Sequence, residues 1–365
     1  MPNDAKTTFG IRLRQARSMA GLSLRGLSGK INGAVSYNAL NKYEKGEMMP
    51  SSDVLVAVAK ATGQPTGFFF REPKPKLAEV KFRAVTSKFS KTSEGRVRES
   101  SQDFFERYTE IEAILGLDST FKNPLGNIMI ESLEDVDDAA LLIRKAWNLG
   151  FDALPNIHET LENNNVKVYE ANHEEGFDGL SAWFGDIPVI ALSKQLDKQC
   201  LTRKRHTALH ELGHLLFKGR IKGITTEKQE EPYVSRFSGA ILLPRKNLES
   251  ELGGYRTTLS IEELKEIKAK YGISMSAIIY RSEQLGLIPD TLKKAFYKLY
   301  NSKQHAKNLR QVDTEPGIYE GSESSNRFKT LVFRAVSNGD ISVSKASELL
   351  KCSVEEFRNS YQAIG

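Results

Sequence analysis

Cysteine and long apolar runs are both scarce in this sequence. Only two of the 365 residues are cysteines, Cys200 and Cys352, and neither lies in a CxxC pair or near the histidine cluster described below. So few thiols exclude a disulfide framework and favour a reducing compartment. No apolar run approaches the ~18 residues that a membrane helix needs, and the N-terminus lacks the apolar core of a secretory signal. We therefore expect a cytoplasmic protein with no membrane partner.

The positive charge of the chain is concentrated at its N-terminal end. The formal net charge is +6, and residues 1–72 hold ten basic and five acidic side chains, a net charge of +5. A small basic domain ahead of a nearly neutral body suggests that this domain meets a polyanion such as nucleic acid. A basic surface that only keeps the protein soluble is the alternative at this point.

The length of the chain predicts more than one domain. We expect an α+β protein, mostly helical, whose metal-binding domain carries a small sheet. The predicted order along the chain is a helical DNA-binding domain at 1–72, a linker and connecting helix at 73–134, a metallopeptidase domain at 135–290 and a helical C-terminal module at 291–365.

Residues 9–70 read as short helices separated by turns. Ser23 is a good N-cap for one of these helices, and the next helix runs from about Ser36 to Lys45, where Gly46 is placed to end it. Two helices joined by a turn, the second with a polar outer face, form the arrangement that reads a DNA major groove. The side chains expected on that outer face are Ser36, Tyr37, Asn38, Asn41 and Lys42.

This segment resembles a known DNA-binding family. The stretch V-S-Y-N-A-L-N-K-Y-E-K-G-E-x-x-P-S is similar to the XRE (Cro/repressor-like) helix-turn-helix family, although the turn between Leu27 and Val35 is about two residues longer than usual. The resemblance implies binding to an operator in double-stranded DNA, with two copies acting as a homodimer on paired half-sites. A helical bundle used for protein contacts is the alternative.

The connecting region divides into two parts. Residues 71–103 are rich in Lys, Arg, Ser and Pro, which predicts a linker. A helix is expected from about Glu94 to Leu115, with aromatic and aliphatic side chains on one face. We expect this helix to serve packing.

A metal-binding helix is predicted in the second half of the chain. After three strand candidates at 166–171, 179–184 and 186–192, the segment KRHTALHELGHLLF reads as one helix. Its histidines His210 and His214 are four residues apart and so lie on one face, where both can bind one Zn²⁺ ion. Glu211 lies beside that position and is the expected catalytic general base. Two incidental histidines on a buried helix are the alternative.

A third ligand is expected downstream, where Glu227, Glu230 and Glu231 precede another helix. A carboxylate from this cluster would complete a His₂Glu catalytic zinc site. Gly213 is unfavourable within a helix and suggests that another backbone packs closely there. For the group that stabilises an oxyanion, only Tyr255, Tyr280 and His206 are candidates, and the sequence does not choose between them.

These motifs resemble the ImmA/IrrE family of metallopeptidases. The resemblance rests on R-H-T-A-L-H-E-L-G-H-L-L-F, on E-P-Y-V-S-R-F-S-G-A-I-L-L-P and on flanking motifs within 140–290. The family's third ligand lies thirteen residues before the proline of the second motif, which implies Glu231. Two departures are Ser235 in place of the usual Asn and Pro232 directly after that ligand, which leaves Glu230 as a rival. Relatives often cut or control a DNA-bound repressor, and many carry an XRE domain.

The C-terminal part is expected to begin with a helix and a loose polar loop at 290–326. Residues 327–361 then resemble a small helix-turn-helix-like module, with Ser342 and Ser353 as caps. A packing or dimer role is favoured for this module over a second DNA-reading role.

Together these features predict a DNA-binding transcriptional regulator with a zinc-dependent endopeptidase domain. The expected substrate or partner is a regulatory protein, either another repressor or this chain itself. Two alternatives stay open: a transcription factor whose metal domain senses a ligand or partner without cleaving, and the antitoxin of a toxin–antitoxin pair.

Overall fold

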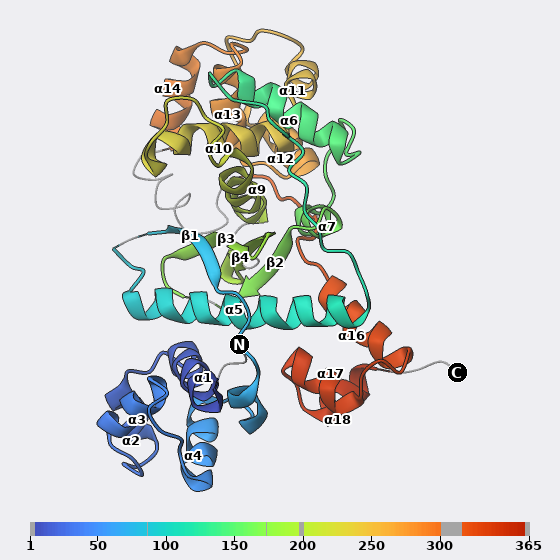
Figure 1. The fold of residues 1–365 in the computed structure, drawn as a ribbon. Helices are drawn as coiled ribbons and strands as arrows, with labels where there is room; N and C mark the ends of the chain where they lie inside the picture. Colours follow the sequence, from blue (N-terminus) through green and yellow to red (C-terminus); the bar gives the residue numbers. More distant parts are fainter. Residues whose placement is uncertain (1–3, 86, 173, 197–200, 301–315, 362–365) are drawn as a thin grey trace.

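One long helix divides the molecule in the computed structural model, which describes residues 4–361 except 86, 173, 197–200 and 301–315. This helix, α5 (Lys91–Ile114), has the sheet and most later helices on one side, and the N-terminal domain and C-terminal module on the other (Figure 1). The predicted fold class, α+β and mostly helical with one small sheet, is confirmed. None of the described helices combines the length and apolar character that crossing a bilayer requires.

The N-terminal domain contains α1 (Ala5–Met19), α2 (Leu24–Lys30), α3 (Tyr37–Glu44), α4 (Ser52–Thr62) and the 3-10 helix η1 (Thr66–Phe70). The predicted cap forms, because Ser23 accepts a hydrogen bond from the Gly26 N–H at 2.9 Å. Ser36 also caps its helix, by accepting a hydrogen bond from the Ala39 N–H at 3.2 Å. Gly46, at φ 72°, follows α3 in the left-handed conformation that favours glycine. The apolar faces of these helices form a core of their own around Phe9, Leu13 and Leu40.

The sheet has four strands, β1 (Leu77–Ala84), β2 (Lys167–Ala171), β3 (Phe177–Phe184) and β4 (Ile187–Ser193), in the order β1-β3-β4-β2. β3 pairs antiparallel with both β1 and β4, while β2 and β4 are parallel. Alternate side chains of β4 pack in opposite directions, Val189 toward α5 and Ile190 toward α9 (Leu201–Phe217). Helix α9, which carries the predicted metal ligands His210 and His214, therefore lies against one face of the sheet, and α5 covers the other (Figure 1).

The other helices that the structure describes in the central body surround α9 in the largest core. They are α6 (Asp135–Ala146), α7 (Ile157–Asn163), α10 (Glu227–Leu242), α11 (Arg245–Leu252), α12 (Ile261–Tyr271), α13 (Met275–Gln284) and α14 (Asp290–Tyr300). Helix α10 packs directly along α9. Gly213 makes this approach possible, since an added Cβ would lie 3.0 Å from the Val234 Cβ. The predicted close packing at Gly213 is present, but the neighbour is a side chain and not a backbone.

The C-terminal module contains α16 (Arg327–Ser337), α17 (Val343–Leu350) and α18 (Val354–Ser360). The predicted caps are confirmed, because Ser342 and Ser353 each accept a hydrogen bond from a backbone N–H three residues on. The module packs against the end of α5 through Tyr108 and Ile111. A packing role for this module agrees with its place in the fold.

Two segments differ from what the sequence predicted. The linker expected at 71–103 contains the edge strand β1, and α5 already begins at Lys91. A loose loop was expected before residue 326. Residues 316–326 are instead held to the central body by the buried Glu323, and residues 301–315 lie outside the described residues. Glu323 forms a fully buried ion pair with Arg205 of α9, and its carbonyl accepts a hydrogen bond from Lys204 at 2.6 Å.

Candidate metal centre and nucleic-acid interface

His210 and His214 lie one turn apart on α9 and face α10. Their ring centroids are 5.0 Å apart. The Nε2 atom of His210 lies 3.4 Å from one oxygen of Glu231, and the Nε2 atom of His214 lies 3.3 Å from the other. One carboxylate and two imidazole nitrogens thus converge, with these three atoms within 4.8 Å of one another. This donor set fits a divalent cation of the zinc type.

Glu230 contacts the opposite side of the His214 ring. Its carboxylate lies 3.2 Å from His214 Nδ1, the nitrogen that faces away from Glu231. Lys81 of β1 donates to the same carboxylate at 2.5 Å and lies 3.3 Å from His214 Nδ1. Histidines that bind metals commonly donate their second ring N–H to a carboxylate. Glu230 therefore has the position of such a supporting carboxylate, and Glu231 has the position of a ligand.

All three glutamates lie within the first turns of α10, although the sequence suggested that they precede a helix. Helix α10 begins at Glu227, with Thr226 and Gln229 forming a capping box, and it continues through Pro232. Since Glu230 and Glu231 are consecutive on a helix, their side chains point about 100° apart. The two carboxylates can therefore reach different nitrogens of His214.

The electrostatics of the cluster favour a bound cation. Burial lowers the pKa of His210 to about 4, so this ring is neutral and able to bind a metal. Burial also disfavours a charge on His214, but hydrogen bonds to Glu230 and Glu231 outweigh that effect and raise its pKa to about 9. The two carboxylates thus attract positive charge to His214, and a divalent cation would supply that charge in place of the proton.

Glu211 is held by the sheet beneath α9. Its Oε2 atom accepts a hydrogen bond from the Ser181 hydroxyl of β3 at 2.7 Å. Its Oε1 atom is buried and has no hydrogen-bond partner among the residues that the structure describes. Burial raises the pKa of this carboxyl group, and the Ser181 bond counters part of the rise. A buried carboxylate with one oxygen held and the other free is suited to take up a proton.

A cavity of about 190 Å³ joins the histidines to β1. Its lining includes Lys81, Phe82, Arg83, Ala84, His210, Glu211, His214, Glu227 and Glu231. The sequence analysis missed Lys81 and Arg83, because it assigned their segment to a linker. A local indication was present, since Val80 and Phe82 alternate with these cations as in a half-buried strand.

The three residues weighed for oxyanion stabilisation are not among the described residues that line this cavity. Tyr255 and Tyr280 are both exposed. His206 lies one turn before His210, with ring centroids 6.2 Å apart. Burial, with the nearby charge of Arg83, lowers its pKa to about 3. His206 therefore stays neutral and does not provide a positive charge.

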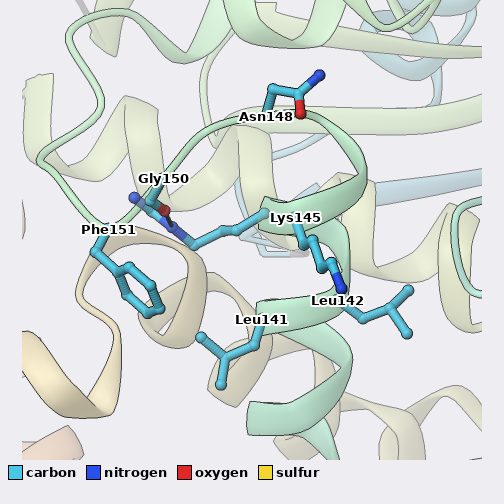
Figure 2. Close-up of a pocket in the computed structure, with 7 residues that line it drawn as sticks. Leu141, Leu142, Lys145, Asn148, Gly150 and Phe151 are labelled. Carbon is cyan, nitrogen blue, oxygen red and sulfur yellow. Dashed lines mark hydrogen bonds between the residues drawn. The ribbon is translucent and has the colours of Figure 1, made fainter.

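A larger hollow of about 620 Å³ lies at the end of α6, away from the histidines. Figure 2 shows its lining, which includes Leu141, Leu142, Lys145 and Phe151. Arg144, also in the lining, uses its guanidinium on the backbone carbonyls of Gly150, Ile241 and Asp152. Among the residues described around it, no paired acid and base line this hollow, so it is not the candidate site.

The predicted DNA-reading side chains lie on the outer surface of the N-terminal domain. Helix α1 lies between α3 and α5, so α3 faces away from the central body (Figure 1). Of the five residues, Ser36, Tyr37, Asn38 and Lys42 are exposed and Asn41 is half-buried. The Arg25 guanidinium of α2 lies over the Tyr37 ring, 5.2 Å from its centroid. This contact adds Arg25, which the sequence analysis did not select, to the same surface.

Comparison with known proteins identifies two parts of the chain. Residues 13–69 match the family model of a helix-turn-helix domain, and residues 161–283 match that of the IrrE N-terminal-like domain, whose members are typically metallopeptidases. A search of curated proteins found no match. The helix-turn-helix match contains α2 and α3, and the second match contains His210, Glu211, His214 and Glu231. The two matches confirm the fusion of an XRE-type domain with an ImmA/IrrE-like domain that the sequence predicted.

Proposed function

We propose that this chain, which joins a helix-turn-helix domain to an IrrE N-terminal-like domain, is a DNA-binding transcriptional regulator with a zinc-dependent endopeptidase activity. One observation carries the proposal. The buried carboxylate of Glu211 keeps a free oxygen beside the convergent nitrogens of His210 and His214. Binding a metal alone does not require this carboxylate, whereas hydrolysis of a peptide bond does.

In this proposal His210, His214 and Glu231 hold the zinc ion, and Glu230 orients His214. The ion, when bound, acts as a Lewis acid on the peptide carbonyl and on water. Glu211 accepts a proton from the attacking water at its free Oε1 atom and then passes it to the departing amine nitrogen. Its raised pKa helps it to hold that proton between the two steps. Ser181 keeps the carboxylate in place through both.

The N-terminal domain would bring this activity to an operator in double-stranded DNA. Helix α3 presents polar side chains on the outer surface, where Asn38 and Asn41 can contact base edges and Lys42 a phosphate. Arg25 stacks on Tyr37 and adds a cation to the same surface. We further propose that the protein acts in the cytoplasm as a homodimer, since domains of this type bind paired half-sites.

The proposed substrate is a regulatory protein, either another repressor or this chain itself. The cavity at the histidines is small and opens beside the edge strand β1, so it accommodates an extended chain segment better than a folded surface. A metal domain that only senses a partner, including an antitoxin that neutralises a toxin, is the second possibility. In that case the free oxygen of Glu211 would have no use.

The test compares the full-length protein with its Glu211→Gln variant. The amide of this variant could keep the Ser181 bond but could not carry a proton. We expect the variant to bind zinc as the wild type does, by elemental analysis, and to lose cleavage of candidate repressors about 10²–10⁴-fold. Glu262→Gln, an exposed glutamate on α12, is the matched control and should leave both properties unchanged. The peptidase proposal is wrong if the wild type binds zinc but Glu211→Gln changes neither the cleavage of any candidate repressor nor any cellular phenotype of the wild type.

A further inference from the structure

Arg83 lies on the face of β1 that is turned toward the metal helix. In the antiparallel pair β1–β3, Lys81 is opposite Ser181 and Arg83 is opposite Gly179. Residues directly opposite each other share a face of the sheet. Ser181 contacts Glu211 on that face, and an added Cβ on Gly179 would lie 3.3 Å from the Glu211 Cγ. Arg83 therefore extends over the sheet beside Glu211, and it lines the cavity there.

The guanidinium of Arg83 has no ion-pair or hydrogen-bond partner within the described part of the chain. Lys81, two residues earlier on the same face, is by contrast bound to Glu230 at 2.5 Å. Strand β1 contributes two cations to the cavity, and one of them, Lys81, is already paired with a carboxylate of the protein. Arg83 is half-buried, and its guanidinium N–H groups are available to bind a molecule that enters the cavity.

The charge of Arg83 acts on Glu211, the proposed general base. Burial raises the pKa of Glu211, and Arg83 is among the positive groups that oppose the rise. Burial lowers the pKa of His206, and the positive charge of Arg83 lowers it further. Arg83, Glu211 and His210 line the same cavity, and the other cation of that lining, Lys81, is bound to Glu230.

We propose that Arg83 is a catalytic residue that binds the oxyanion formed during peptide hydrolysis, an inference that rests on the proposed peptidase function. As the water oxygen attacks the carbonyl carbon, the π-electron pair of the C=O bond moves to the carbonyl oxygen, which becomes negative. The water proton goes to Glu211. When the C–N bond breaks, its electron pair goes to the amine nitrogen, which takes that proton, and the C=O bond re-forms.

Arg83 supplies what this step needs and what its neighbours lack. A guanidinium presents five N–H donors and a charge that does not depend on pH near neutrality. His206 is neutral, and Tyr255 and Tyr280 are not among the described residues that line the cavity. A donor aimed at the developing oxyanion acts chiefly on the rate of the chemical step, and removal of one such donor reduces kcat by about 10²–10³-fold.

The first measurement needs no turnover. Inorganic phosphate, a tetrahedral anion, is titrated into the zinc-loaded full-length protein, the Arg83→Met variant and the Arg83→Lys variant by calorimetry. We expect Arg83→Met to weaken phosphate binding at least tenfold and Arg83→Lys to weaken it less, with zinc affinity unchanged within about threefold. Lys88→Met, which removes an exposed cation five residues further along the same segment, is the matched control. Equal phosphate affinity in wild type and Arg83→Met overturns the proposal.

The second measurement uses a peptide that the wild type cleaves. We expect Arg83→Met to lower kcat about 10²-fold or more and to change KM little. A raised KM confined to acidic peptides, with kcat intact, would instead show that Arg83 recognises a substrate carboxylate, and would overturn the oxyanion role. If the wild type cleaves nothing, the peptidase function fails and the oxyanion role fails with it. The phosphate titration would then still report separately whether Arg83 binds an anion.

Discussion

Arg12 and Glu106 form a buried ion pair, with Nη1 and Oε2 2.6 Å apart, although 94 residues separate them in the sequence. Arg12 also donates to the backbone carbonyls of Arg71 and Glu72, where the chain leaves the N-terminal domain. One guanidinium therefore joins α1, the exit of the DNA-binding domain and α5. The N-terminal domain is held to the central body by a buried polar contact and not by a flexible linker.

Breaking this pair should destabilise the whole chain. Arg12→Met leaves Glu106 buried without its charge partner, a change that typically costs about 3–5 kcal/mol. Urea unfolding followed by circular dichroism measures the loss. Arg12→Met combined with Glu106→Leu should recover much of it. Lys222→Met, which removes an exposed ion pair with Glu131, should cost less than ~1 kcal/mol. Similar losses for Arg12→Met and Lys222→Met would contradict a structural role for the buried pair.

Asp103 should make the stability of the same junction depend on pH. It contacts Arg71 of the N-terminal domain at 2.9 Å, Arg107 at 3.1 Å and Lys351 of the C-terminal module at 2.7 Å. Burial disfavours its charge, but Arg107, Lys351 and Arg71 outweigh that effect and lower its pKa to about 2. Because this value lies below the unfolded value of about 3.9, Asp103 stabilises the fold above pH ~4. That contribution, about 2 kcal/mol, is lost as the pH falls toward 2.

The measurement is the free energy of unfolding of wild type and Asp103→Asn between pH 6 and pH 2. The difference between them should be constant above pH ~5 and should shrink as the pH falls from about 4 to 2. Asp340→Asn, at an exposed aspartate in the C-terminal module, serves as the control. A difference that stays the same down to pH 2 would show that Asp103 does not titrate with the fold.

Zinc affinity should distinguish the two glutamates that the sequence left as rivals. Glu231→Gln removes a proposed ligand and should weaken zinc binding more than about 100-fold, whereas Glu230→Gln removes the support of His214, and such changes weaken binding about 10–100-fold. Competition with a chelating dye measures both. If Glu230→Gln were the more damaging change, Glu230 would be the ligand and Glu231 its support.

Gly213→Ala should disturb the metal site without altering any of its side chains. The added methyl group would lie 3.0 Å from the Val234 Cβ and 3.2 Å from a Phe237 ring carbon, so α10 must move away from α9. We expect a loss of about 1–3 kcal/mol from overpacking and weaker zinc binding, since α10 carries Glu231. Gly29→Ala is the control, because nothing described lies within 4 Å of its added Cβ, and it should be neutral or slightly stabilising. Unchanged zinc affinity in Gly213→Ala would show that the spacing of the two helices is not critical.

DNA binding should depend on the outer face of α3. Lys42→Ala should weaken binding to the protein's own promoter region and reduce the slope of log affinity against log salt by about 1. Asn41→Ala should cost about 1–3 kcal/mol on the operator and less on unrelated DNA. Lys60→Ala, an exposed cation on α4, is the control. Electrophoretic mobility shifts over a range of salt concentrations test all three, and unchanged binding by both α3 variants would remove α3 from the DNA interface.

Much of this fold follows from local sequence patterns. Serine caps indicated the starts of helices at Ser23, Ser342 and Ser353, because a side-chain oxygen satisfies N–H groups that the helix leaves free. The strands β2, β3 and β4 were predicted within about two residues from their apolar patterns. The approach of His210 and His214 followed from their four-residue spacing, which places both on one helical face, while Glu231 followed from the family resemblance.

What the sequence did not reveal depends on partners far away along the chain. Strand β1 has only a short alternation of apolar and charged residues, and its many charged residues led to its assignment as a linker. Glu323 looked like part of a polar loop, because nothing near it in the sequence indicates that Arg205 is buried 118 residues earlier. Buried charges of this kind are stable only in pairs, so neither member can be recognised alone.

Strand β1 and the 316–326 segment, which the sequence analysis assigned to a linker and a loose loop, set the limits of the smallest fragment that could contain the candidate metal site. Strand β1 contributes Lys81 and Arg83 from before α5, and the 316–326 segment contributes Glu323 from beyond α14. A fragment cut at residues 135 and 290 would leave Arg205 buried without its counter-charge and would open the cavity on the side of β1. The unit around the candidate metal site therefore extends from β1 to the 316–326 segment. A fragment that folds on its own around this site would have to run from about residue 73 to beyond residue 326, and it would therefore include α5.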